Sequence, residues 1–88
     1  MKAILTVIGK DRVGIIAQVS QLLAKYQVNI VDVSQTIMDD NFVMMMMVTI
    51  PLADQFAQID AELENFGNEA HLEVKLRNTK LFEAMHNI

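Results

Sequence analysis

The segment 9–15, Gly-Lys-Asp-Arg-Val-Gly-Ile, holds the residue types best suited to binding chemistry. Asp11 is well placed as the N-cap of a helix, with its carboxylate accepting from the backbone amide of Gly14. Arg12 would then lie in the first helical turn, where the helix dipole disfavours a cation by ~0.3–1 kcal/mol. Asp11 itself or a bound anion would offset that cost.

Gly14 costs ~0.5–1 kcal/mol relative to alanine inside a helix, so the close approach of another backbone or of a ligand would explain it. Free amides at a helix start, a bare glycine and a cation together are typical of a carboxylate or phosphate site. A helix cap with a tight crossing of helix over strand explains the same residues. Both interpretations stay open at this point.

Other side chains that could bind a metal or take part in catalysis have simpler explanations. The run 44–47 is four methionines, which a strand would divide between its two faces and which suit packing; soft-metal sites usually recruit Cys or His as well. His71 and His86 have no partner at metal-ligand spacing. Asp39 and Asp40 are adjacent in a turn and solvated. We therefore predict no catalytic residue, no metal site and no cofactor.

Composition excludes several further classes of function. The chain has 88 residues, 52% of them hydrophobic, no cysteine and a formal net charge of −4. A nucleic-acid partner would need a basic stripe, and a membrane surface a polybasic segment; neither is present. No apolar run approaches the ~18 residues of a membrane span. A cytoplasmic, non-enzymatic domain is expected, with more apolar surface than a small monomer hides.

Hydrophobic periodicity predicts an alternation of strands and helices. Strands are expected at 2–8, 30–38, 42–50 and 71–77, helices from about 13 to 26, from 54 to 66 and at 79–88, and a hairpin turn at 39–41. Gly67 is expected to close the second helix. The first strand is expected to be buried on both faces.

The two halves of the chain repeat with an offset of about 40 residues. A doubled β-α-β unit of this kind is typical of the ferredoxin-like βαββαβ fold, in the α+β class. Right-handed crossovers then predict a four-stranded antiparallel sheet of order 4-1-3-2, with two helices on one face. The domain would occupy 1–78, followed by a short C-terminal helical tail at 79–88.

The free face of this sheet is expected to carry an apolar stripe, because both alternation sets of strands one and three are apolar. The second strand lies at an edge and has one acid, Asp32, and no Lys, Arg or Pro to block pairing. Both features predict self-association into a homodimer or a higher oligomer.

The motif Gly-Lys-Asp-Arg-x-Gly-Ile, followed after about fifteen residues by Asn-Ile-Val-Asp at 29–32, resembles the ACT domain family. The resemblance covers residues 1 to about 77. It is strongest to the subgroup of stand-alone ACT proteins, glycine-cleavage-type regulators and formyltetrahydrofolate deformylase N-terminal domains.

This resemblance implies a regulatory domain whose effector, an amino acid or another small molecule, sits between the first strand-helix loop of one subunit and the second strand of a neighbour. The implied ligand-binding residues are Asp11, Arg12, Val13, Gly14, Ile15, Asn29, Ile30 and Asp32.

Two positions depart from the family pattern. Many relatives have Pro in place of Val13 and Gly in place of Gln27, which leaves Asn29 as the expected left-handed turn residue.

A regulated enzyme or a transcriptional regulator would receive the signal. The alternative is a dimerisation module that binds no small ligand.

Overall fold

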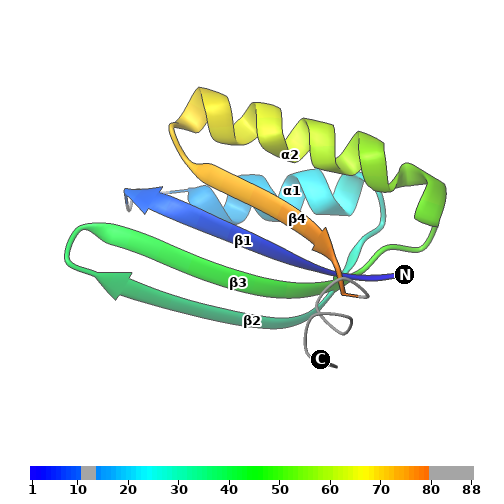
Figure 1. Cartoon of the computed structure of the whole chain (residues 1–88), viewed down its shortest axis with the longest axis horizontal. Helices are drawn as coiled ribbons and strands as arrows, with labels where there is room; N and C mark the ends of the chain where they lie inside the picture. Colours follow the sequence, from blue (N-terminus) through cyan, green and yellow to red (C-terminus); the bar gives the residue numbers. More distant parts are fainter. Residues whose placement is uncertain (11–13, 80–88) are drawn as a thin grey trace, which may run out of the picture.

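The structure is a computed structural model, which describes residues 1–10 and 14–79 (Figure 1). Its elements are β1 (Lys2–Lys10), α1 (Ile15–Lys25), β2 (Asn29–Met38), β3 (Asn41–Thr49), the short 3-10 helix η1 (Ala53–Gln55), α2 (Phe56–Ala70) and β4 (Glu73–Asn78). The strands form one antiparallel sheet in the order β2-β3-β1-β4. The predicted ferredoxin-like fold and its strand order are therefore confirmed.

The two faces of the sheet differ because side chains alternate along each strand. On β1, Leu5 and Val7 are fully buried, and on β3 so are Met44 and Val48. These residues join one core cluster with the buried residues of both helices, which therefore cover the same face. The opposite, open face carries no helix in the described part of the chain.

The core-facing stripes of the helices follow the predicted spacing. In α1 the buried residues are Ile15, Val19 and Leu23, four apart, as an amphipathic helix requires. In α2 they are Ile59, Leu63, Gly67 and Ala70. Each stripe faces the sheet, and this burial is the main source of helix stability in a domain of this size.

On the open face, β1 is less buried than the sequence predicted. Ile8 is 42% exposed, so the prediction that this strand is buried on both faces is wrong. The apolar stripe itself is confirmed, because Met45 on the neighbouring strand is 53% exposed on the same face.

The ends of three elements differ from the predictions. Helix α2 continues through Gly67 to Ala70, and His71 takes the left-handed conformation that ends it, with φ 59°. His71 therefore precedes β4 instead of belonging to it. After α1, Gln27 adopts φ 57°, whereas Asn29 is already the first residue of β2. The expected left-handed role of Asn29 is wrong, and Gln27 fills the conformation itself.

The hairpin between β2 and β3 turns as predicted at Asp39 and Asp40. Asp39 has φ 57°, a conformation that Asp tolerates better than most residues. Asn41 already pairs with Met38 and begins β3. The expected terminal helix at 79–88 falls, from residue 80 on, outside the described residues. No helix in the described part of the chain is both long and apolar enough to cross a membrane.

An ion pair joins the end of α1 to α2. Lys25 Nζ lies 2.9 Å from Glu62 Oε1, and the same ammonium group stands 5.5 Å from the centre of the Tyr26 ring. Hydrogen bonds from Lys25 and from the Tyr26 phenol lower the pKa of Glu62, and the carboxylate raises the pKa of Lys25 in turn. Both side chains are partly exposed, so solvent screens the pair.

This pair predicts a specific pH dependence of stability. Because the pKa of Glu62 is lower in the folded chain than its ordinary value of 4.5, its contribution to stability is complete above that value and is lost as the pH falls through the folded pKa. In urea unfolding at pH 3 to 7, Glu62→Gln should lose less stability on acidification than the wild type. Glu64→Gln, at an exposed position of the same helix, is the control. If both variants follow the wild-type curve, the ion pair does not contribute.

Candidate functional site

The start of α1 is set by Gly14. This residue is the N-cap, with φ 92° and ψ −1°, and the first helical residue is Ile15. The carbonyl of Gly14 accepts from the amide of Gln18 at 2.9 Å. The helix therefore begins later than predicted, and its N-cap is Gly14 and not Asp11, so that expectation is wrong. The expected place of Arg12 in the first helical turn concerns a residue outside the described ones.

The conformation of Gly14 also settles why a glycine stands there. A positive φ of 92° is rarely adopted by L side chains. A Cβ at this position would meet no heavy atom within 4 Å, so close packing of helix on strand does not explain the residue. The backbone conformation requires glycine, whether or not a ligand approaches it.

Replacing Gly14 by alanine should therefore lower the free energy of unfolding by about 1–2 kcal/mol, the cost of a left-handed alanine. Gly14→Asn should lose clearly less, because asparagine tolerates this region. Thermal unfolding of the two variants side by side measures the difference. An alanine variant as stable as the wild type would contradict the positive φ.

Of the remaining loop candidates, the structure describes only Ile15. Its side chain is 2% exposed and belongs to the core, so only its backbone can face a ligand. Ile16, the next residue, is 41% exposed. Asp11, Arg12 and Val13 lie outside the described residues.

A hollow of about 500 Å³ lies beside the first turn of α1. Its lining residues are Ile16 from α1, Gln35, Thr36 and Ile37 from β2, and Phe42 from β3. The walls are mainly apolar, with the side-chain amide of Gln35 among them; the side chain of Thr36 lies in the same row as Val43, on the open face. Such a lining suits a ligand with an apolar body and a few polar groups, and the volume lies within the usual range of small-molecule sites.

Sequence reasoning missed all five of these residues, and two signals pointed to Ile16, Ile37 and Phe42. Ile15 and Ile16 are adjacent, and the spacing of four places Ile15 with Val19 and Leu23 on the core-facing stripe, which leaves Ile16 beside it. Ile37 and Phe42 flank the hairpin turn and pair with each other on the side of the helices. Their exposure differs sharply, at 61% for Ile37 and 5% for Phe42.

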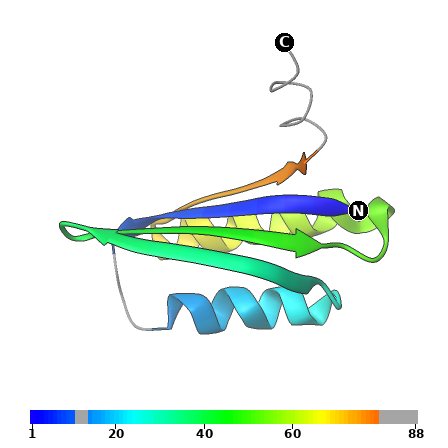
Figure 2. The ribbon, with the colours of Figure 1, turned by 90° about the horizontal axis from the view of Figure 1, so that it is seen from below.

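The other predicted candidates lie at the far end of the sheet. Asn29 pairs with Thr49, which pairs with Lys2, whereas Lys10 pairs with Asn41 beside the hairpin turn. Eight residue steps separate Lys2 from Lys10, about 27 Å of strand. Figures 1 and 2 both show α1 beginning where β1 ends and the hairpin turns, with the start of β2 at the opposite end.

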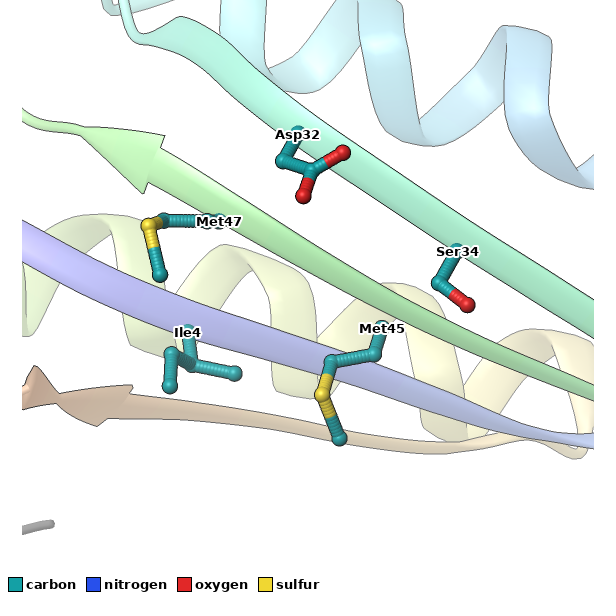
Figure 3. A pocket seen from close by; sticks show the side chains of 5 residues that line it. All are labelled: Ile4, Asp32, Ser34, Met45 and Met47. Carbon is teal, nitrogen blue, oxygen red and sulfur yellow. The ribbon is translucent and has the colours of Figure 1, made fainter.

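Within one chain, therefore, the structure does not bring Asn29 and Ile30 to the start of α1. Asp32 is separated from it as well, because its row on β2 belongs to the open face. There Asp32 and Ser34 line a smaller cavity of about 110 Å³ together with Ile4, Met45 and Met47 (Figure 3). Oδ1 of Asp32 accepts from the backbone amide of Val33 at 2.9 Å.

Among residues 1–10 and 14–79, no three His, Asp or Glu side chains gather in a group that could hold a metal ion. The candidate site is a surface built from apolar walls and the side-chain amide of Gln35.

The βαββαβ order and the four-stranded antiparallel sheet define a small domain of the ferredoxin-like class. The family model for the ACT domain matches residues 2–77, and the chain belongs to the ACT domain family. ACT domains are regulatory domains that bind small molecules. The resemblance predicted from the motif is confirmed.

Individual relatives agree with this assignment. A UPF0237 protein of Listeria monocytogenes is 48% identical over 89 residues, covering 100% of both chains. The structure of an ACT domain protein from Streptococcus pneumoniae is 40% identical, with a TM-score of 0.84 and 94% of each chain covered. A formyltetrahydrofolate deformylase from Pseudomonas putida shares the fold, at 15% identity and a TM-score of 0.79 over 89% of this chain and 29% of its own.

Proposed function

We propose that this chain is a regulatory module that binds an amino acid, or a related small carboxylate, in the hollow beside the start of α1. The observation that carries the proposal is the hollow itself, with the exposed apolar side chains of Ile16 and Ile37 on its walls and the amide of Gln35 among them. A carboxylate would accept from the helix-start amides, where the helix dipole favours negative charge.

Residues 10–12, Lys-Asp-Arg, precede the lining residue Ile16 by a few positions in the sequence and carry charges of both signs. Arg12 would meet the carboxylate of an amino acid, and Asp11 its ammonium group. Val13, Gly14 and Ile15 would contribute backbone. The described part of the lining has no charged residue, so we assign the recognition of charge to the loop.

The proposal includes a second copy of the chain, because Asn29 and Ile30 lie at the far end of their own sheet. If two β2 edges pair antiparallel, the start of one β2 lies beside the end of the other. Asn29 and Ile30 of one copy then approach Gln35 and Ile37 of its partner. Every residue of β2 is exposed, so this edge is accessible for such pairing.

In this role the module would be a homo-oligomer that passes its signal to a regulated enzyme or to a transcriptional regulator. It would carry out no chemistry itself. The competing function is a dimerisation module without a small ligand, in which the apolar side chains of the hollow contact protein only.

Thermal-shift screening against amino acids, folates and nucleotides tests the proposal. At 100 times its dissociation constant, a ligand of the folded state adds about 2.7 kcal/mol of stability. Arg12→Ala should weaken the binding of the best compound by about 1.5–3 kcal/mol. Lys2→Ala, which removes a cation from the far end of the sheet, should leave binding unchanged. If no compound raises the melting temperature, the dimerisation module is the better explanation.

A further inference from the structure

The open face of the sheet is organised in rows that run across the strands. One row consists of Asp32, Met47, Ile4 and Arg77, which pair in this order across β2, β3, β1 and β4. The next row consists of Ser34, Met45, Thr6 and Lys75. A third row consists of Thr36, Val43, Ile8 and Glu73. Each of these rows has an apolar side chain on at least one central strand. On β4 the first two rows end with a base and the third ends with an acid.

Charge is therefore distributed unevenly on this face. Asp32 is the acid on the β2 side, whereas β4 carries Arg77 in the same row as Asp32, Lys75 in the next row and the acid Glu73 in the third. Within residues 1–10 and 14–79, neither Asp32 nor Arg77 takes part in an ion pair. Both side chains are exposed. The central strands between them present Ile4, Met45 and Met47 around a cavity of about 110 Å³ (Figure 3).

We infer that the open face binds the open face of a second copy, about a twofold axis that runs parallel to the strands above the middle of the sheet. This rotation stacks β2 of each copy over β4 of the other and β3 over β1. Asp32 then faces Arg77 of the partner subunit within the same row, twice per dimer. Met47 likewise faces Ile4 of the partner subunit, at the cavity.

The charges select this orientation. A twofold axis perpendicular to the strands would stack β2 on β2, and β2 contains no Lys or Arg to meet Asp32. A carboxylate enclosed without a base is costly. The parallel axis places a base opposite this acid, and it places Glu73 opposite Thr36 of the partner subunit, so no like charges meet.

The area fits a weak but specific contact. From Lys2 to Lys10 the face is about 27 Å long, and four strands make it about 19 Å wide. Each copy would cover roughly 500 Å², or about 1,000 Å² in total, at the lower limit of specific interfaces. We expect a dissociation constant in the micromolar range. The contact uses the face of the sheet and not the β2 edge, and it requires no ligand.

A charge swap tests this contact by sedimentation equilibrium. Asp32→Arg or Arg77→Asp alone places like charges opposite each other and should weaken dimerisation at least about tenfold. The double variant Asp32→Arg/Arg77→Asp restores opposite charges and should return the dissociation constant to within about threefold of the wild type. Glu64→Arg changes net charge as Asp32→Arg does, but at an exposed position of α2, and should have little effect.

Several results would overturn the inference. One is a double variant that dimerises no better than the single variants; another is Glu64→Arg weakening the dimer as much as Asp32→Arg. Single variants with unchanged association would show that the open face is not the interface, and would leave the ligand proposal standing. A fourth such result is a wild-type chain that is monomeric but dimerises once residues 80–88 are removed. In that case residues 80–88 of the same chain, and not a second copy, would occupy the open face.

Discussion

Replacing Met46 by alanine should lower the free energy of unfolding by about 2–5 kcal/mol, because it empties a fully enclosed site in the core. Met46 is 1% exposed on the central strand β3. Met45 precedes it on the open face and is 53% exposed. Met45→Ala is therefore the matched control, and its effect should stay within about 0.5 kcal/mol.

Urea unfolding of both variants, at a dilution that keeps the chain monomeric, gives the comparison directly. A shift of the β3 register by one residue would exchange the two faces of the strand. Equal losses for the two variants, or a larger loss for Met45→Ala, would therefore mean that this register is wrong.

The contrast between these methionines is not visible in the sequence. Four identical residues in a row carry no alternation, so the pattern predicts a strand without saying which side chains face the helices. The hairpin resolves it in the structure. Asp39 and Asp40 form the turn, Ile37 pairs with Phe42, and every second residue after Phe42 is buried. The order of strands was predictable because the two β-α-β units repeat; the burial within the run was not.

The ends of the helices were predicted less well, for a related reason. Propensity places glycine at left-handed helix ends, but Gln27 and His71 occupy those conformations here. Connections to the following strands require them, at a cost of roughly 1–3 kcal/mol for each such residue. Packing between elements overrides local preference, and a single sequence does not reveal it.

The same distinction applies to the candidate site: its local part was predictable from the sequence, and the part brought in by strand pairing was not. The motif around Gly14 correctly located the start of α1 to within a few residues, because a glycine and a charged loop are local signals. The wall of the hollow was missed, because Gln35 and Ile37 come to α1 only through the pairing of β2 with β3. Asn29 and Ile30 belong to the site only if a second copy is present, and their place in it stays a prediction.

Replacing Gly67 by valine should destabilise the chain by about 3 kcal/mol or more, through overpacking against backbone. Gly67 is buried inside α2, where a Cβ would lie 2.8 Å from the carbonyl oxygen of Leu72 and 2.9 Å from Cγ2 of Val74. The carbonyl of Gly67 also accepts from the amide of Leu72 at 2.8 Å. This hydrogen bond holds the chain entering β4 against the helix, so neither element can move aside without losing it.

Gly67→Ala should lose less than the valine variant, because alanine regains about 0.5–1 kcal/mol of the helix penalty of glycine while still meeting the Leu72 carbonyl. Ala61→Val places valine at an exposed position of the same helix and should cost only about 0.5 kcal/mol in helix propensity. The three variants, unfolded in urea under one set of conditions, separate close packing from propensity. If Gly67→Ala is as stable as the wild type, β4 does not approach α2 this closely. The expected order is instead Ala61→Val the most stable, then Gly67→Ala, with Gly67→Val far below both.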